Sequence, residues 1–542
     1  MKSFNFFSKT KQIHIGLFLI ALLLWSCTFL TDGKIFSKDP LNMLCFPIDT
    51  DAVSFMHITS KVLVFLVILG MLYFLRHCRK HPKLFLSFIS FFALYILLLL
   101  CSYPGYFMSD DTVIFGYATR YYPVYWHNYL TSLYYMVGMS LFPASTGPII
   151  LQDMCLSLVF SFIYYKADKN FNHKCKHILL LCGLLPFVLL SALMCFRPVL
   201  YAPFFLFYFA YLYFEKKEQQ PLTLCKLIFL ALFTSILCFW RSEGIVLFVF
   251  SLILIPLSYQ IPIRKIILFT VILAICFLTV RMPQVRGEKA YYGSDYLIVS
   301  TIRPLSLIIH REQTYEGAED DWANINQIVD LDYLSYETLS CSSYNRYNSD
   351  YNAGRFSESG ADAQTQSNYL KSALRLIAHN LDLYFAERLQ LFFVTNGIYN
   401  YDDALVMGMR AVSTSSFHLY QSDKEYGYEL IEGNKRIPIT GHEQVAQVLF
   451  QCGGEAYLPI LLLLFISTIY TGIRKKFFAF WALLSLIARE AVIFLTAPAS
   501  FIQYSYPVMY VTVFFIFIFI IEKKEQQYNI INTKSTTERA FS

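Results

Sequence analysis

Apolar runs about as long as a membrane-spanning helix recur along the whole chain, and they restrict its fold more than any other feature. A bilayer core about 30 Å thick needs about 20 apolar residues per helix. Charged residues make up 15% of the chain, against about 25% in soluble domains. The sequence predicts an all-α polytopic membrane protein with about 12 transmembrane helices. The apolar runs lie near 13–30, 59–75, 84–102, 148–165, 178–196, 199–214, 227–240, 245–259, 265–280, 456–472, 477–495 and 506–521.

The first apolar run admits two interpretations. Lys9 and Lys11 precede it, and Leu24-Trp25-Ser26-Cys27 resembles a lipoprotein cleavage site. Trp25 is bulky for such a site, and the apolar run continues beyond Cys27. We therefore expect a first transmembrane helix rather than a signal peptide.

Lys and Arg residues in the connections predict the orientation, because cytoplasmic loops carry an excess of both. Every second connection is basic, so both termini are predicted to be cytoplasmic in a multi-pass cell-membrane protein. This clustering also accounts for the net charge of +6 without a nucleic-acid partner. The basic stretches are 2–11, 76–80, 166–176, 216–226, 264–265, 474–476 and 523–524.

One further apolar stretch, 126–142, would place the basic connection 166–177 outside if it crossed the membrane. Its apolar residues recur at helical spacing, and its other face carries His127, Asn128, Thr131, Ser132 and Ser140. The pattern is typical of an amphipathic helix that lies at the membrane interface. A shorter helix of this kind is predicted over 112–122, so both interfacial helices belong to an outward loop, 103–147.

The segment 281–455 is polar, and its length of about 175 residues suffices for a mixed, mainly helical extracytoplasmic domain. Helical periodicity covers 367–395, whereas 340–366 looks irregular. Cys341 and Cys452 both fall in this segment and could pair. The predicted organisation is a two-helix membrane extension (1–83), a membrane segment with the outward loop (84–280), the soluble domain (281–455), three C-terminal transmembrane helices (456–521) and a disordered cytoplasmic tail (522–542).

Two adjacent carboxylates, Asp110 and Asp111, directly follow the third span. Their mutual repulsion raises one pKa unless a cation lies near. That suits a general base or a divalent-metal site for Mg or Mn. The alternative is structural: Ser109 or Asp110 caps the following helix, and its dipole favours Asp111.

Other ionisable residues are predicted at membrane depth, where charge is costly and usually functional. Arg197 and the pair Arg241 and Glu243 fall in outward turns. An arginine there can bind a lipid phosphate through paired hydrogen bonds, or Arg241 and Glu243 can pair with each other. Arg489 and Glu490 lie within one span. Two charged side chains in a span require either a polar interior of the helix bundle or compensation of each charge by the other.

Two more side chains, Arg120 and His127, lie on or near the interfacial helices and are candidate substrate contacts. A histidine in such a place is more often a hydrogen-bonded interfacial residue. Tyr504-Ser505-Tyr506-Pro507 resembles an aromatic belt at the membrane surface. The sequence contains no Walker loop or zinc-ligand spacing.

The motifs Pro-Gly-Tyr-Phe-Met-Ser-Asp-Asp at 104–111, Arg-Tyr-Tyr-Pro-Val-Tyr-Trp-His at 120–127 and Arg-Ser-Glu-Gly at 241–244 resemble those of GT-C membrane glycosyltransferases, specifically a bacterial, largely uncharacterised branch. The resemblance covers about 84–521 and implies a seven-helix module at 84–280. Arg197-Pro198 stands where the resemblance leads us to expect Lys-Asp, which removes a second acidic ligand.

The resemblance implies an inverting transfer of sugar from a polyprenyl-phosphate-linked donor to an extracytoplasmic glycan, lipid or protein. Asp110 or Asp111 would deprotonate the acceptor hydroxyl. Arg241 and Arg197 would stabilise the departing phosphate. Arg120, His127, Glu243 and Arg489 are further expected substrate-binding residues.

Three alternatives remain open at this stage. An O-antigen or capsule-type polysaccharide polymerase or ligase also uses lipid-linked substrates, but it typically relies on a cationic outward loop. A non-enzymatic transporter of lipid-linked oligosaccharides would more often show two related halves, and no such repeat is visible. A membrane-anchored binding protein is the third possibility.

Overall fold

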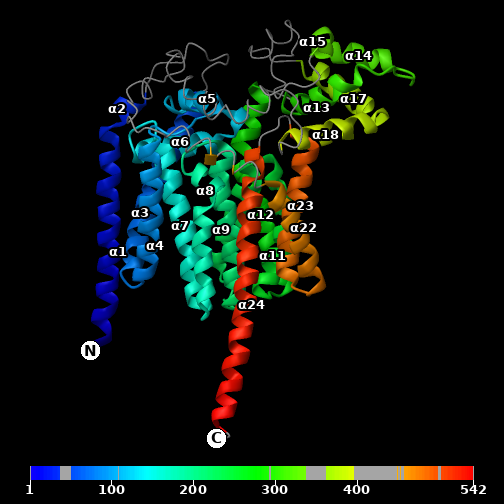
Figure 1. Ribbon diagram of the computed structural model, residues 1–542. Helices are drawn as coiled ribbons and strands as arrows, with labels where there is room; N and C mark the ends of the chain where they lie inside the picture. The colour runs from blue at the N-terminus through cyan, green and yellow to red at the C-terminus, as the bar shows by residue number, and fades with distance from the viewer. Residues whose placement is uncertain are drawn as a thin grey trace.

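The computed structural model describes residues 2–36, 50–107, 109–291, 295–336, 362–395, 448–449, 452, 457–497 and 502–540. These residues form helices and no strand, apart from one isolated bridge between Tyr106 and Met194. Long helices run side by side as a bundle, short helices gather at one end, and both chain termini lie at the other (Figure 1). The predicted all-helical fold is confirmed for the described residues.

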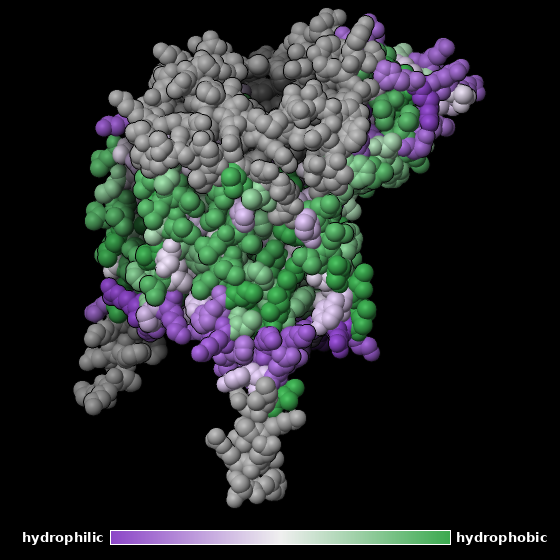
Figure 2. All heavy atoms as spheres, in the orientation of Figure 1, coloured by the Kyte–Doolittle hydropathy of each residue, from purple (hydrophilic) through white to green (hydrophobic). Residues whose placement is uncertain are grey.

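Eight helical segments of the described chain are long and apolar enough to cross a membrane, and each coincides with a predicted span. The protein is therefore an integral membrane protein, with a broad apolar belt (Figure 2). The segments are Gln12–Ile35, which includes parts of α1 (Lys2–Cys27) and α2 (Asp32–Ile35); α3 (Thr50–Cys78); α4 (Pro82–Cys101); α7 (Gly147–Asn170); Ser242–Tyr259, with α11 (Val246–Tyr259); Ile263–Glu288 of α12 (Ile263–Tyr291); α23 (Phe477–Thr496); and Ile502–Ile530, with α24 (Tyr506–Ala540).

The four other predicted spans differ from a long apolar helix. Helices α10 (Leu224–Trp240) and α22 (Tyr457–Ile473) are apolar but have 17 residues each, or about 26 Å. Helix α9 (Arg197–Lys217) is rich in tyrosine and contains Pro203.

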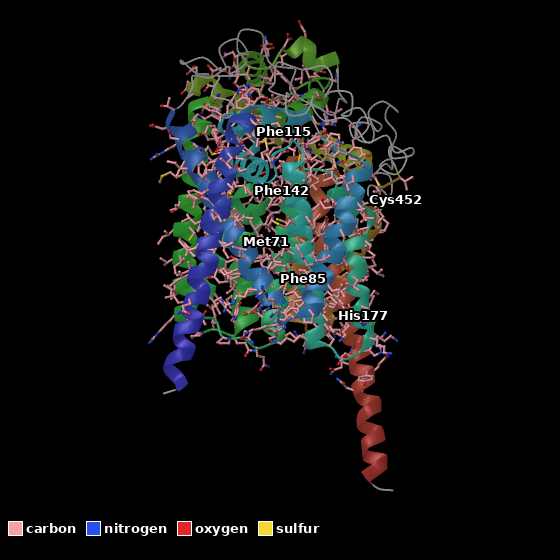
Figure 3. The ribbon with its side chains drawn as sticks, turned by 90° about the vertical axis from the view of Figure 1, so that its left-hand side faces the viewer. Met71, Phe85, Phe115, Phe142, His177 and Cys452 are labelled. Atoms are coloured by element: carbon pink, nitrogen blue, oxygen red, sulfur yellow. The ribbon has the colours of Figure 1, made fainter. Side chains whose placement is uncertain are left out.

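The prediction of one continuous helix over 178–196 is wrong. A 3-10 helix, η3 (Lys174–Leu184), is followed by the short α8 (Pro186–Ser191). Pro186 begins the second helix, since a proline disfavours helical geometry in the residue before it. The 11 residues of η3 rise about 22 Å and the six of α8 about 9 Å, so the pair still reaches across the bundle. His177 of η3 and Phe115 lie at opposite ends (Figure 3).

The basic connections meet at one end of the bundle, where the belt gives way to polar residues (Figure 2). The connection before α4 and the connection after α7 both lie at this end. The chain between them therefore passes from one end of the bundle to the other only twice, through α4 and α7, and residues 126–142 do not make a further passage. The ion pairs that join the connections are Lys83–Asp168 (2.8 Å), Lys166–Glu218 (2.9 Å) and Lys476–Glu522 (2.6 Å).

Helices α5 (Ser109–Ala118) and α6 (Tyr129–Leu141) follow α4 at the opposite end, joined by the 3-10 turn η2 (Tyr125–His127). With 13 residues, or about 20 Å, α6 is too short to cross a bilayer. Its predicted polar face does not meet water, however. Thr131 donates to the His127 carbonyl and accepts from the Trp240 indole, and Ser132 accepts from the Val124 amide. Helix α6 is thus packed within the protein on both faces.

Five described helices follow α12, and the first four of them form a second apolar core, whose buried members include Ile298, Ile302, Ile325, Tyr369 and Leu376. The periodicity predicted over 367–395 corresponds to two helices that meet at Asn380. Cys341 and most of 340–366 lie outside the described residues. These helices are α13 (Asp295–Ile308), α14 (Ala318–Asn326), α15 (Leu331–Tyr336), α17 (Ala363–His379) and α18 (Leu381–Thr395).

At the C-terminus, α24 continues to Ala540, through the segment predicted to be disordered. A polar segment rich in Glu, Lys and Gln has good helix propensity, and it extends a helix that is already nucleated in the bundle.

Candidate functional site

Ionisable side chains gather at the end of the bundle that holds α5 and α6. They come from segments far apart in the sequence and form two adjacent groups. The first contains Asp110, His127 and Arg197, and the second contains Arg241, Glu243, Arg489 and Glu490.

Asp110 and His127 are brought together by the turn between α5 and α6. Asp110 lies in the first turn of α5 with its side chain 38% exposed, and its Oδ2 is 3.9 Å from Nδ1 of His127. That distance is too long for a direct hydrogen bond. The His127 ring is buried, and its Nδ1 has no hydrogen-bond partner.

The protonation state of His127 follows from this setting. Burial lowers the pKa of His127 to about 4, opposed by Asp110 and reinforced by Arg197 and Arg241. The imidazole is therefore neutral near pH 7 and holds one proton-accepting nitrogen. A neutral histidine beside an accessible carboxylate can orient or relay a proton.

Asp111 has a different environment from Asp110. Its carboxylate is fully buried and accepts a hydrogen bond from the Tyr135 hydroxyl at 2.9 Å. Burial, and then the nearby Asp111 charge, raise the pKa of Tyr135 well above its ordinary value. Asp111 thus joins α5 to α6, which leaves Asp110 as the accessible carboxylate.

The structure gives no support to a shared metal site at these carboxylates. Among the described residues, no group of three or more His, Cys, Asp or Glu side chains is placed to hold a metal ion. Asp110 and Asp111 have different partners, so the predicted Mg or Mn site stays a prediction, and we derive no step through a metal.

The second group is a buried ion network around Glu243. Its Oε1 lies 2.8 Å from Arg241 and 2.9 Å from Arg489, and all three residues are at most 5% exposed. The Arg241–Glu243 pair, one of the two alternatives open from the sequence, is therefore present. Gly244 is needed beside it, because a Cβ there would lie 2.3 Å from the Leu237 carbonyl oxygen.

Arg489 and Glu490 extend this network through α23. Arg489 donates to the Tyr504 carbonyl and lies 3.5 Å from Glu490. Glu490 accepts from Tyr457 at 2.6 Å and Ser505 at 2.8 Å. Two arginines face two carboxylates, so the network compensates its own charge. Tyr504 stacks beside Arg241, 5.0 Å from the ring centroid, and Tyr506 is buried, so the predicted aromatic belt is wrong here.

A cavity of about 520 Å³ is lined by Trp126 and Asn128, the two residues that flank His127 in the chain. Its aromatic wall contains Trp126, Phe239 and Trp240, and Arg197 and Arg281 supply positive charge. Arg197 makes one long hydrogen bond, 3.4 Å, to the Trp126 carbonyl, and its Nε is buried without a partner. Within the described part of the chain, neither arginine forms an ion pair with a carboxylate. The cavity can therefore bind an anionic ligand with a ring.

Most of the predicted site residues thus fall into the two groups, and Asp111 and Arg120 lie outside them. Arg120 donates to the Gly116 carbonyl and the Thr119 hydroxyl at the end of α5. Sequence reasoning missed Arg281, Trp240 and the helix-joining Tyr135. Arg281 could have been found as the first charge after the apolar run 265–280; nothing local distinguishes Tyr135 from the many other tyrosines.

Comparison of the chain with family models, with curated proteins and with solved structures finds no match. The interpretation of the site therefore depends on its own chemistry.

Proposed function

We propose that this membrane protein is a glycosyltransferase that moves a sugar from a polyprenyl-phosphate-linked donor to an acceptor on the extracytoplasmic face. One observation carries the proposal: an accessible carboxylate, Asp110, lies 3.9 Å from the neutral His127, and the residues on either side of His127 line a cavity that Arg197 also lines. A carboxylate base and a cation for a leaving phosphate are the two groups that this transfer requires.

The proposed step is a single displacement at the anomeric carbon. Asp110 accepts the proton of the acceptor hydroxyl, whose oxygen forms the new glycosidic bond. The bond from the anomeric carbon to the phosphate oxygen breaks, and its electron pair leaves with the polyprenyl phosphate. Attack opposite the leaving group inverts the configuration. Neutral His127 holds the carboxylate or acceptor in place.

Arg197 and Arg281 are the cations proposed to bind the phosphate, and Arg197 is the stronger candidate, because Glu288 also lines the cavity and its charge interacts with that of Arg281. Arg241 and Arg489 share Glu243, so we assign them a positioning role instead. They hold the turn between α10 and α11 against α23, beside the cavity. Trp126 and Trp240 offer the aromatic surface on which a sugar ring stacks.

The proposed orientation follows from the basic connections at the far end of the bundle. The excess of Lys and Arg there favours the cytoplasm. Asp110, His127 and helices α13 to α18 would then lie on the extracytoplasmic side, with both termini in the cytoplasm. All twelve segments that run between the two ends would cross the bilayer.

A polysaccharide polymerase or ligase is the second candidate. The two arginines of the cavity favour it, since such enzymes bind lipid-linked substrates through cationic groups. If Arg197→Gln abolished activity while Asp110→Asn remained active, a polymerase or ligase would be favoured over the transfer that uses Asp110 as the base.

Replacement of Asp110 by Asn tests the main proposal. We expect cells that carry Asp110→Asn to lose the surface glycan at normal protein level, because the base is removed while its size is kept. Asp320→Asn, an exposed change on α14, is the matched control and should leave the glycan intact. A wild-type glycan profile in the Asp110→Asn strain would refute the catalytic assignment.

A further inference from the structure

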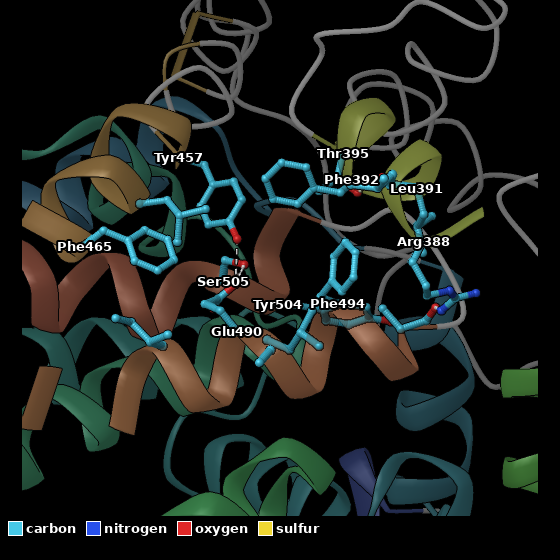
Figure 4. A pocket seen from close by; sticks show the side chains of 16 residues that line it. Arg388, Leu391, Phe392, Thr395, Tyr457, Phe465, Glu490, Phe494, Tyr504 and Ser505 are labelled. Carbon is cyan, nitrogen blue, oxygen red and sulfur yellow. Dashed lines mark hydrogen bonds between the residues drawn. The ribbon is translucent and has the colours of Figure 1, made fainter. Parts of the chain in front are cut away.

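A second cavity, of about 310 Å³, lies on the other side of the Glu243 network, between α18, α22, α23 and the segment before α24 (Figure 4). Apolar side chains form most of its wall, among them Leu391, Phe392, Phe465 and Phe494. Tyr457 and Ser505 both point toward Glu490 at one side and donate hydrogen bonds to it. These polar groups bind one another, which leaves a surface suited to an apolar ligand.

Helix α18, which covers this cavity, has two faces of opposite character. Leu381, Phe385, Leu389 and Phe393 recur every four residues and are 40–52% exposed. Residues four apart lie on one face of a helix. The opposite face is buried and includes Glu387, which pairs with Arg303 at 2.7 Å. An apolar stripe on an exposed face marks a surface that contacts lipid or another protein.

The position of α18 agrees with a place at the membrane surface. Its Tyr384 hydroxyl donates to the Leu495 carbonyl at 2.7 Å, and Arg388 donates to the Ala497 carbonyl at 2.8 Å. Both acceptors lie at the end of α23, one of the membrane-length helices. Helix α18 is thus fastened where this span leaves the apolar belt, and Figure 1 shows it lying across the tops of α22 and α23.

The rim of the cavity opens toward the same surroundings. Leu389 and Phe465 line the cavity, yet they are 46% and 44% exposed. Phe465 belongs to the face of α22 that also exposes Leu462, Ile466 and Ile469, as expected of a lipid-facing surface. The opening therefore lies between the apolar stripe of α18 and the apolar face of α22.

We propose that this cavity binds a long hydrocarbon chain of a membrane lipid, which enters sideways from the bilayer beneath α18. A chain gains little hydrophobic free energy on leaving the bilayer, since lipid tails are as apolar as the cavity. The gain comes from dispersion contacts, because an empty apolar cavity leaves its wall atoms without partners. The site does not depend on sugar transfer, and either a polyprenyl phosphate or a phospholipid could supply the chain.

Photo-crosslinking of the full-length protein in lipid nanodiscs tests the proposal. One sample contains a polyprenyl phosphate and another a phosphatidylcholine, each with a diazirine within the hydrocarbon chain. We expect crosslinks to be concentrated in peptides of 457–465 and 487–497. Labelling by the polyprenyl probe alone assigns the cavity to a lipid-linked substrate, and labelling by both assigns it to membrane lipids in general.

Ala491 lines the cavity and is small, so Ala491→Trp should fill it. We expect at least about tenfold less labelling of the cavity peptides, a change equal to about 1.4 kcal/mol. Ile466→Trp, on the same lipid-facing surface but outside the cavity, is the matched control. Ala491→Leu repeats the test with a smaller side chain if the tryptophan variant does not fold. Labelling spread evenly along the belt, or unchanged in folded Ala491 variants, would overturn the proposal.

Discussion

Glu243 and Arg489 form a buried ion pair of 2.9 Å although they are 246 positions apart in the sequence. The pair connects the turn before α11 to α23, and so attaches the C-terminal helices to the segment that contains α5 and α6. Its partners Arg241 and Glu490 make the network neutral. This neutrality is the reason to seek the phosphate-binding cations elsewhere, at Arg197 and Arg281.

Removal of the shared carboxylate should destabilise the protein. In Glu243→Gln, only Glu490 remains to compensate two buried arginines, and loss of one partner of a buried pair costs about 3–5 kcal/mol. We expect a lower midpoint of thermal unfolding in detergent than for Glu319→Gln, an exposed control on α14. The double variant Glu243→Gln/Arg489→Gln should recover part of the loss. Equal midpoints for Glu243→Gln and the control would contradict the network.

Acid should weaken the fold through His127. Its pKa falls from 6.5 to about 4 in the folded chain because the ring is buried. Between these values the unfolded chain binds more protons, so stability decreases as the pH falls from about 6.5 to about 4. In His127→Gln, the midpoint of thermal unfolding should depend less on pH over that range. The idea fails if the wild type and the variant lose stability in parallel.

Tyr135→Phe should destabilise the contact between α5 and α6. It removes a donor from the buried Asp111, at a cost of about 1–3 kcal/mol. Thermal unfolding measures the loss. Tyr528→Phe is the matched control, because Tyr528 is 41% exposed on the far end of α24. No difference between the two variants would show that the hydrogen bond contributes nothing.

Gly287→Ala should reshape the candidate substrate cavity. A Cβ at Gly287 would lie 2.1 Å from the ring of Tyr125, which lines that cavity, whereas one at Gly70 meets nothing within 4 Å. Overpacking of this kind costs about 1–3 kcal/mol. We expect reduced transfer and a lower unfolding midpoint for Gly287→Ala, and near-normal values for Gly70→Ala. Normal activity in both variants would show that Tyr125 is not part of the substrate site.

The proposed orientation can be tested with an impermeant thiol reagent on intact cells that carry a cysteine-free background. Glu319→Cys on α14 should react from outside, and Lys169→Cys in the last turn of α7 should react only after the membrane is opened. Both positions are exposed, so access to the side chain is equal. Reaction of Lys169→Cys from outside would invert the topology and remove the basis for an extracytoplasmic site.

The sequence predicted the membrane character, the positions of the long helices and the alternation of basic connections. Each of these depends on local properties: about 20 apolar residues make a span, and Lys and Arg mark its cytoplasmic end. The same reasoning placed Asp110 and His127 in one outward loop, 103–147, but it did not predict that their side chains approach to 3.9 Å. It failed at 178–196, where a mid-run proline divides an otherwise apolar segment.

Side-chain partners across the bundle could be found only in the tertiary structure. In sequence, Asp110 and Asp111 are equivalent neighbours, yet Tyr135 binds one and the other stays accessible. Arg241, Arg489 and Arg197 are equally plausible phosphate ligands until Glu243 neutralises two of them. Hydropathy and loop charge are summed over each segment of the chain, whereas burial and pairing depend on which residues packing brings within about 3 Å.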